Sequence, residues 1–457
     1  MSGILFSFGL LLLTGTGLSP SPYSEVASAL VFEKRVADST VFARNIEEHV
    51  PALEQWTKNI FSVSPEESLT DPTKLIQSIP EKLSVWTYGI SPDSFRWAYE
   101  SLQKRFPSAE VDIRFITNEN DYLLLLSSSF RQGLSPDIFL VSSVWRSEYE
   151  SLFADAPEIF FSPEECFETF LSSSCSAFEK EGKMKGVPLF VDAPFLIVNR
   201  TLLSDDRVAV SGKPEASWQG FLSNRKNFEK YSKNNKNSFV SIPLQENSSL
   251  FSLLFFSLLA QAESTGEKMT DSTLEIFQLL DLLTTTEGGG KHANTDAQEQ
   301  FLNGESAILI GTNETLQHIL QKRDVAKNPK IEKKDILTLP LPQLDQKNPI
   351  IAGETRALVV SKRSAYQREA WALALFLAFR ENQTIVLRQD NFFSARNDLF
   401  SENKMKSLLS GIQNLPNNIL DLAFRKQLLE NGMRFFSGEI SAEEASSTAL
   451  SSFLQNP

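Results

Sequence analysis

Cysteine and histidine are scarce in this sequence. Its 457 residues include two cysteines, Cys166 and Cys175, and three histidines, His49, His292 and His318. The histidines lie far apart and form no ligand spacing with the cysteines, so we expect no metal site and no other cofactor. In an oxidising compartment the two cysteines would close one small loop, whereas in a reducing compartment they would stay free thiols. The sequence leaves both states open.

Basic residues are fewer than acidic ones, with 44 Lys and Arg against 57 Asp and Glu. The formal net charge is −13 at pH 7, and the isoelectric point is about 5.0. Binding to nucleic acid or to an anionic membrane surface needs a basic surface, so we expect no nucleic-acid partner. Two enzyme motifs are missing as well. There is no Gly-x-Ser-x-Gly elbow, and the glycine-rich stretch 287–291 lacks the spacing of a phosphate-binding loop.

One apolar run near the N-terminus is a candidate membrane segment. Together with its less apolar flanking residues the run covers residues 3–18, slightly fewer than the roughly 20 residues that cross a bilayer. No Lys or Arg precedes it, although the basic region of a signal peptide normally does, and the first basic residue is Lys34. For residues 1–18 we therefore favour a membrane anchor over a signal peptide, and both over a buried helix of a cytosolic protein. Anchor and signal peptide alike predict an extracytoplasmic protein, in the periplasm or at the cell surface.

Residues 19–80 are expected to form a spacer. They begin with Ser-Pro-Ser-Pro, and residues 62–80 are rich in Ser, Pro, Glu and Asp, which is typical of linkers. Between these ends, apolar residues recur at spacings of three and four over 40–61. This pattern predicts a helical segment, which Pro51 would kink or restart.

The globular body begins with alternating strand and helix patterns. Apolar or alternating runs at 83–86, 111–116 and 138–141 predict strands, and helical spacings between them predict two helices. This order is typical of an α/β fold with a buried parallel sheet and helices on both faces. Ligands of such folds bind outside the carboxyl ends of the strands.

The chain is organised around residues 182–203, GKMKGVPLFVDAPFLIVNRTLL. Two apolar strand patterns there are separated by Asp192 and Pro194, and because proline cannot donate to a sheet, the first strand ends or bends at this point. We interpret this as a chain that leaves one sheet and enters another, with Asp192 near the cleft between them. An ordinary bent strand, with the Asp capping a turn, is the alternative.

A second crossing is predicted at the proline-marked segment 337–342. Two crossings divide the body into two lobes and supply the strands that a hinge needs. We predict that lobe 1 consists of residues 81–191 plus 336–390, and lobe 2 of residues 192–335 plus 391–457.

Several segments of this body resemble the extracellular solute-binding proteins of ABC transporters, in the sugar-binding, maltose-binding-protein-like branch of the periplasmic binding-protein fold. From Lys82 onward the matching stretches are LSVWTYG, GLSPDIFLVSS, the crossing 182–203, SWQGFL, FLNGESAILIGTN, AGETRALVVSKRS and FFSARNDL. The resemblance implies a two-lobe (Venus-flytrap) α/β fold with crossing hinge strands. Here the N-terminal apolar helix and the spacer would precede that fold.

The resemblance also implies a function without catalysis. Proteins of this family bind a small polar solute, here a carbohydrate, in the cleft between the lobes, close around it by a hinge motion, and deliver it to the permease subunits of an ABC importer. Two alternatives stay open. One is a membrane-anchored sensor or adhesion module that kept the fold. The other is a glycoside hydrolase that uses Asp192 and Glu246 as paired carboxylates.

The expected solute contacts combine strand ends with positions that match the family. Aromatic rings would stack on the C–H faces of a sugar, while carboxylates, amides or Arg would bond its hydroxyls. Asp192 is the leading candidate. Asn313 stands where the family often has a stacking Trp, so lobe 2 lacks that surface. The full set is Trp86, Tyr88, Ser142, Ser143, Trp145, Asp192, Glu246, Asn313, Gly353, Glu354 and Arg396.

Overall fold

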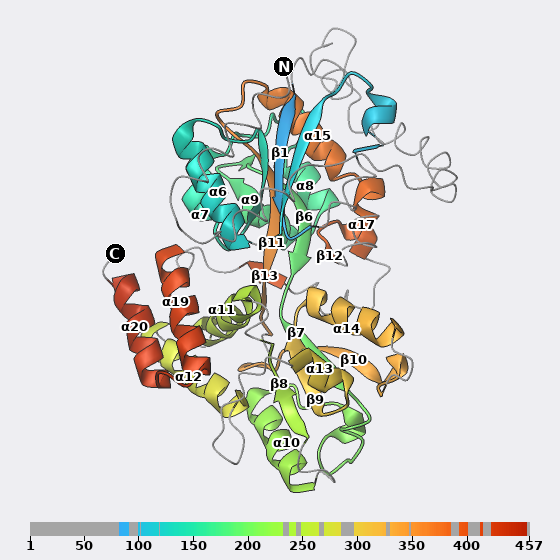
Figure 1. Ribbon diagram of the computed structural model, residues 1–457, viewed down its shortest axis with the longest axis vertical. Coiled ribbons are helices and arrows are strands. Elements are labelled where there is room, and N and C mark those ends of the chain that lie inside the picture. Colours follow the sequence, from blue (N-terminus) through green and yellow to red (C-terminus); the bar gives the residue numbers. More distant parts are fainter. Residues whose placement is uncertain are drawn as a thin grey trace, which may run out of the picture.

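Two α/β lobes are stacked along the longest axis of the molecule (Figure 1). The computed structural model describes residues 82–90, 99–100, 102–117, 119–231, 237–243, 248–264, 269–284, 297–325, 330–346, 349–384, 393–400, 412–414 and 422–454. The predicted two-lobe fold is confirmed. The predicted anchor and spacer, residues 1–80, lie outside the described residues. Within the described part, no helix has the length and apolar character that crossing a membrane requires.

Lobe 1 is built on a sheet with the strand order β12-β6-β11-β3-β1-β2, and β13 pairs with β11. The strands are β1 (Leu83–Tyr88), β2 (Val111–Ile116), β3 (Ile138–Ser142), β6 (Val187–Asp192), β11 (Ile351–Val360), β12 (Phe393–Ser394) and β13 (Ile412–Asn414). β2 and β3 pair parallel to β1, as predicted, but β11 runs antiparallel to β3 and β6. The parallel sheet predicted for the first three strands is confirmed, and β11, which enters lobe 1 from lobe 2, adds the antiparallel member.

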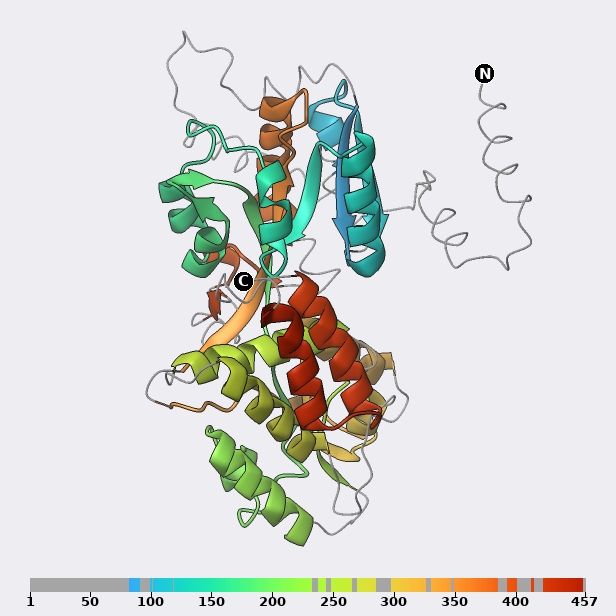
Figure 2. The same cartoon turned by 90° about the vertical axis from the view of Figure 1, so that its left-hand side faces the viewer.

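Helices cover both faces of the lobe 1 sheet (Figures 1 and 2). α6 (Glu119–Gln132) and α7 (Arg146–Tyr149) lie on one side, and α15 (Gln367–Leu377) lies on the other. The central strand β3 is consequently buried at all five positions. This explains its four consecutive apolar residues, 138–141, since a strand covered on both faces has no solvated side.

A disulfide joins two short helices at the edge of lobe 1. α8 (Pro163–Thr169) starts with a capping box, in which the Ser162 hydroxyl accepts from the backbone of Glu165 and the Glu165 carboxylate accepts from the backbone of Ser162. Cys166 of α8 is bonded to Cys175 of α9 (Ser172–Phe178). The structure thus decides between the two states that the sequence left open. A disulfide suits an oxidising, extracytoplasmic compartment.

Lobe 2 has a four-stranded sheet in the order β10-β7-β9-β8, surrounded by helices (Figure 2). Its strands are β7 (Phe195–Asn199), β8 (Ser238–Ser241), β9 (Ser306–Gly311) and β10 (Ile336–Pro340). Its helices are α10 (Trp218–Tyr231), α11 (Ser248–Ser264), α12 (Met269–Thr284), α13 (Ala297–Leu302), α14 (Asn313–Val325), α19 (Leu422–Phe436) and α20 (Ala442–Leu454). Edge-to-face phenylalanine pairs, such as Phe277 with Phe435, fill the space between α12 and α19.

The predicted crossings are present. β6 ends at Asp192 in the lobe 1 sheet, and β7 begins at Phe195 in the lobe 2 sheet, so the chain changes lobes over Ala193 and Pro194. The return path leads from β10 in lobe 2 to β11 in lobe 1. Proline at position 194 fits this place, because a residue between two sheets needs no ladder hydrogen bond.

The predicted lobe boundaries need three corrections. Residues 336–340 are predicted in lobe 1, but β10 pairs antiparallel with β7 and belongs to lobe 2. Residues 393–394 and 412–414 are predicted in lobe 2, but β12 pairs with β6 and β13 pairs with β11, so both strands belong to the lobe 1 sheet. All three strands are short and pair with segments more than fifty residues away in the chain, where local pattern carries no information about pairing.

Candidate ligand-binding site

Polar residues gather where the strands of lobe 1 end beside lobe 2. Asp192 of β6 lies opposite Glu354 of β11, and Ser142 of β3 lies opposite Arg356 of the same strand. α14 of lobe 2 begins next to them, since the backbone N–H of Asn313 donates to the Asp192 carboxylate. The structure therefore brings Ser142, Asp192, Asn313 and Glu354 together at the crossing.

The Asp192 carboxylate is held almost entirely by backbone. Its Oδ1 accepts from the N–H of Ala193 at 2.9 Å and from the N–H of Asn313 at 3.2 Å. The side chain is buried, and burial raises the pKa of Asp192 to about 7. The charge of Glu354 contributes to this shift, while the backbone hydrogen bonds and Arg356 oppose it. The side chain of Asp192 thus changes between its protonated and ionised forms near neutral pH.

Glu354 is the centre of a second, denser cluster. One carboxylate oxygen accepts from the Ser142 hydroxyl at 2.7 Å, and the other accepts from the Arg356 guanidinium, at 2.9 Å from Nε and 2.7 Å from Nη2. Burial lowers the pKa of Arg356, but Glu354, Tyr88 and Glu119 together outweigh this effect, and the pKa is raised overall. Arg356 is therefore a permanent cation held by Glu354.

Ser143 and Gly353 shape the crossing rather than present free polar groups. The N–H of Ser143 donates to the carbonyl of Thr355 at 2.7 Å, and its hydroxyl accepts from the N–H of Thr355 at 3.0 Å. At Gly353, a Cβ atom would lie 2.5 Å from the carbonyl oxygen of Asp192. Glycine is needed there because the backbones of β6 and β11 approach too closely for a side chain.

Two buried acceptors stand at the start of α14 without partners among the described residues. They are the side-chain oxygens Oγ1 of Thr312 and Oδ1 of Asn313. An unpaired buried acceptor is costly, typically by about 1–3 kcal/mol. A solute hydroxyl or amine that donates to these atoms would remove that cost. The sequence reasoning missed Thr312, although its position directly after β9 was a usable sign.

Comparison with known proteins decides the family. A family profile described as bacterial extracellular solute-binding protein matches residues 111–408, more than half of the chain. The chain belongs to this family. It is thereby a solute-binding protein of the extracytoplasmic space and not an enzyme. A search of curated protein sequences finds no match.

Solved structures show the same fold at low sequence identity. An ABC substrate-binding protein from Listeria monocytogenes, solved with cycloalternan, is 17% identical over 82% of this chain and 98% of its own, with a TM-score of 0.62. The sugar-binding protein MalE from Xanthomonas citri is 15% identical over 81% and 95%, with a TM-score of 0.64. Maltose-bound MalE3 of T. maritima is 16% identical over 82% and 99%, with a TM-score of 0.62.

The three aromatic residues expected to stack on a solute are packed inside lobe 1 of this solute-binding protein. The Tyr88 ring lies 4.7 Å from the Tyr122 ring, and the Arg356 guanidinium covers it at 5.1 Å. Trp145 is fully buried. Trp86 is buried as well, with the Arg114 guanidinium 5.3 Å from its ring. Neighbouring rings and guanidinium groups pack against these aromatic residues, and a solute contact at the three positions stays a prediction.

The indole N–H of Trp145 has a carboxylate partner that the sequence reasoning missed. It donates to Glu119 at 2.6 Å. Glu119 lies in the first turn of α6, where the helix dipole favours a negative charge. An acidic residue just before the predicted helix was the sequence sign that could have identified Glu119.

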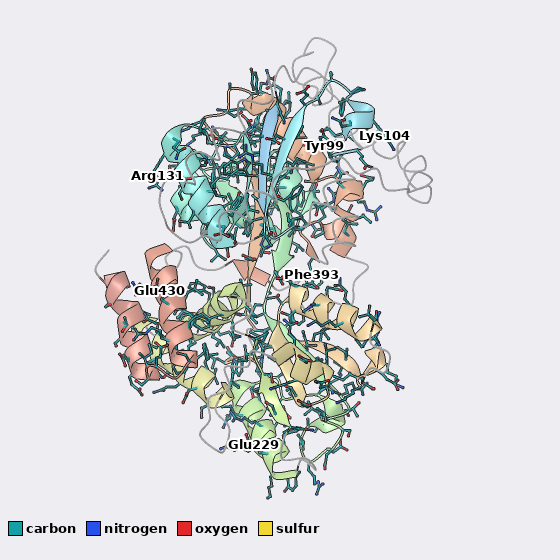
Figure 3. The ribbon with its side chains drawn as sticks, viewed as in Figure 1. Tyr99, Lys104, Arg131, Glu229, Phe393 and Glu430 are labelled. Carbon is teal, nitrogen blue, oxygen red and sulfur yellow. A yellow bond between two sulfur atoms is a disulfide. The ribbon has the colours of Figure 1, made fainter. Side chains whose placement is uncertain are left out.

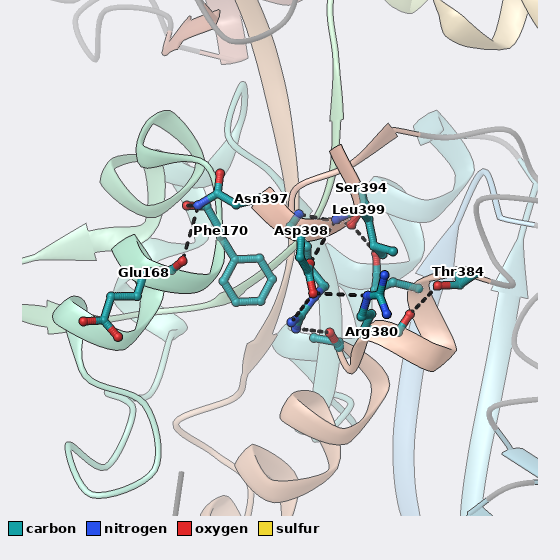
Figure 4. A network of polar contacts seen from close by, with 11 residues as sticks. Glu168, Phe170, Arg380, Thr384, Ser394, Asn397, Asp398 and Leu399 are labelled. Carbon is teal, nitrogen blue, oxygen red and sulfur yellow. Dashed lines mark hydrogen bonds and ion pairs between the residues drawn. The ribbon is translucent and has the colours of Figure 1, made fainter. Parts of the chain in front are cut away.

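Arg396 belongs to a network that fastens β12 to lobe 1, not to the cluster at the crossing. Its guanidinium bonds both carboxylate oxygens of Asp398, and it also donates to the carbonyl of Ala378. Figure 4 shows Asp398 at the centre of this network, with Arg380 as a second cation. The guanidinium of Arg396 is therefore engaged within the lobe, and the solute contact expected for this residue stays a prediction. Glu246, the other expected contact of lobe 2, lies outside the described residues.

Among the described residues, no three His, Cys, Asp or Glu side chains are grouped so that they would hold a metal ion. The chemistry available at the crossing is that of hydrogen bonding. Carboxylate, amide and hydroxyl oxygens can accept hydrogen bonds there. The guanidinium of Arg356 is already paired with Glu354.

Proposed function

We propose that this protein captures a small neutral carbohydrate at the crossing between its lobes and delivers it to the permease of an ABC importer. The observation that carries the proposal is the polar cluster of Asp192, Asn313 and Glu354, which draws on both lobes. A sugar offers many hydroxyl donors, and this cluster is rich in acceptors. The related structures were solved with cycloalternan or maltose, which supports a carbohydrate as the solute class.

The acid excess of the cluster supports a neutral rather than an anionic solute. Asp192 and Glu354 are carboxylates, and the nearby cation Arg356 is engaged by Glu354. An anionic solute would meet repulsion from Asp192 without a free counter-charge among these residues. Ser142, Gly353 and Ser143 would contribute by shaping the lobe 1 side of the site.

Thermal unfolding with a panel of solutes tests this function. At a concentration about 100 times the dissociation constant, a bound solute stabilises the native protein by about 2.7 kcal/mol. We expect a rise of several degrees in melting temperature with at least one of maltose, cycloalternan or related neutral sugars, and none with sugar phosphates at the same concentration. The variant Glu332→Ala, which changes an exposed residue away from the crossing, should show the same rise.

A membrane-anchored sensor or adhesion module is the second candidate function. The packing of Trp86, Tyr88 and Trp145 within lobe 1 favours it, because these rings offer no face to a sugar. The same panel separates the two functions. If the melting temperature rises only with amino acids or polyamines, the solute is one of these and not a carbohydrate. If it rises with no solute, the sensor or adhesion module is favoured.

We further propose that residues 1–18 tether this extracytoplasmic protein to the membrane. The apolar run without a preceding basic residue supports an anchor over a cleaved signal peptide. N-terminal sequencing of the exported protein is expected to show a chain that retains residues 1–18. A mature chain that starts near Leu30, after Ala27-Ser28-Ala29, would contradict the tether and establish cleavage.

A further inference from the structure

One hydrogen bond joins the two lobes directly at the crossing. Asp192 is the last residue of β6 in lobe 1, and Asn313 is the first residue of α14 in lobe 2. The N–H of Asn313 donates to the Asp192 carboxylate at 3.2 Å. A rotation of lobe 2 that moves α14 away from β6 breaks this bond and lets water reach the carboxylate.

The charges around Asp192 do not neutralise it. β11 presents Glu354 and Arg356, which are paired with each other at 2.7 Å. α14 presents Glu314 in its first turn. The short strands β12 (Phe393–Ser394) and β13 (Ile412–Asn414) carry no ionisable residue. Among the described residues, two backbone N–H groups, the start of α14 and the paired Arg356 favour the anion of Asp192, and the buried acid Glu354 disfavours it.

We propose that the Asp192–Asn313 contact makes the arrangement of the two lobes depend on pH, with protonation of Asp192 favouring the joined arrangement. A buried carboxylate next to another acid is more easily buried as the neutral acid than as the anion. Protonated Asp192 can still accept from Asn313 through its carbonyl oxygen. In the separated arrangement, water solvates the anion and removes the penalty.

The direction of the effect follows from linkage. In the joined arrangement the pKa of Asp192 is about 7, whereas the ordinary value for a solvated Asp is 3.8. The joined arrangement therefore binds the proton more tightly. Its stability relative to the separated arrangement increases as pH falls through 7 and decreases as pH rises through that value. Between about pH 8 and pH 6 the ratio of joined to separated molecules should rise roughly tenfold.

This pH response concerns the proposed solute site, and its use for solute capture rests on that proposed function. An acidic environment would favour the joined lobes and hold a solute, and a neutral or alkaline one would favour release. The response itself is a property of the protein without solute. It can therefore be tested even if the solute class proposed above is wrong.

Electron–electron distance measurements on the full chain without solute test the proposal. Spin labels would be placed at Ser147→Cys on α7 and Glu430→Cys on α19, two exposed positions (Glu430 is labelled in Figure 3). The helices α7 and α19 lie on the same side of the two lobes (Figure 1). The two native cysteines are bonded to each other and do not react with the label. We expect the shorter-distance population to grow as pH falls, with the increase setting in near the pKa of Asp192.

Two variants make the test specific. Asp192→Asn imitates the protonated acid and keeps a side-chain oxygen for Asn313, so its distance distribution should stay joined and independent of pH. Asp205→Asn removes a partly exposed carboxylate of lobe 2 that pairs with Arg207, and it should respond to pH like the parent protein. A parent distribution that does not change between about pH 5 and pH 8, or an Asp192→Asn variant that follows pH as the parent does, would overturn the proposal.

Discussion

Replacing Glu354 by Ala is expected to lower the free energy of unfolding by about 3–5 kcal/mol, the cost typical of breaking a buried ion pair from one side. The side chains of Glu354 and Arg356 are only 4% and 12% exposed, so the guanidinium would remain buried without its partner. The Ser142 hydroxyl would lose its acceptor at the same time. Denaturant unfolding of the two proteins at neutral pH measures the loss.

Two controls separate this cost from a general effect of charge. In Glu332→Ala an exposed pair with Lys334 is removed, and no measurable change is expected because surface pairs contribute little. In the double variant Glu354→Gln with Arg356→Met, neither charge is left buried alone, so most of the lost stability should return. If Glu354→Ala unfolds at the same denaturant concentration as Glu332→Ala, the ion pair contributes nothing to the fold.

Much of the framework could be predicted from sequence because it rests on local pattern. β3 begins with four apolar residues in a row, 138–141, between Asp137 and Ser142, so its place as a central strand could be predicted. The crossing at Asp192 was readable because two strand patterns meet at Pro194. These features depend on the pleat, on burial and on the missing N–H of proline, all of which act within a few residues.

Pairing between distant segments was not readable in the same way. In the antiparallel pairing of β10 with β7, Ile336 lies opposite Asn199. The sequence of neither segment indicates that the other is its partner. The lobe boundaries were misplaced at β10, β12 and β13 for that reason. The same limit applied to the disulfide, since the sequence states that Cys166 and Cys175 are close but not that their side chains meet.

The direction of an aromatic side chain was the hardest part of the site to predict. Trp145 follows a strand, which places it near the cleft, but its ring turns inward because Tyr149 packs against it and Glu119 accepts its N–H. Tyr88 is likewise enclosed by Tyr122 and Arg356. These partners come from three other elements, so only the tertiary structure decides between a solute contact and a core residue.

Asp192→Ala is expected to weaken solute binding at least tenfold. A hydrogen bond to a charged group typically contributes about 1.5–3 kcal/mol, and about 1.4 kcal/mol corresponds to a factor of ten in affinity. The melting temperature without solute should change little, because the variant loses two backbone hydrogen bonds but no longer buries a carboxylate whose pKa is raised to about 7. Asp155→Ala, which removes an exposed acid of lobe 1 paired with Lys183, is the matched control.

Calorimetric titration of the best-stabilising sugar into the parent protein and these two variants, at about pH 8 where Asp192 is ionised, tests most directly whether the solute site lies at the lobe crossing. The account predicts parent-like affinity for Asp155→Ala and at least a tenfold weaker affinity for Asp192→Ala, with similar melting temperatures. Unaltered affinity in Asp192→Ala, together with a large loss of its stability without solute, would contradict it and leave Asp192 as a structural residue of the hinge.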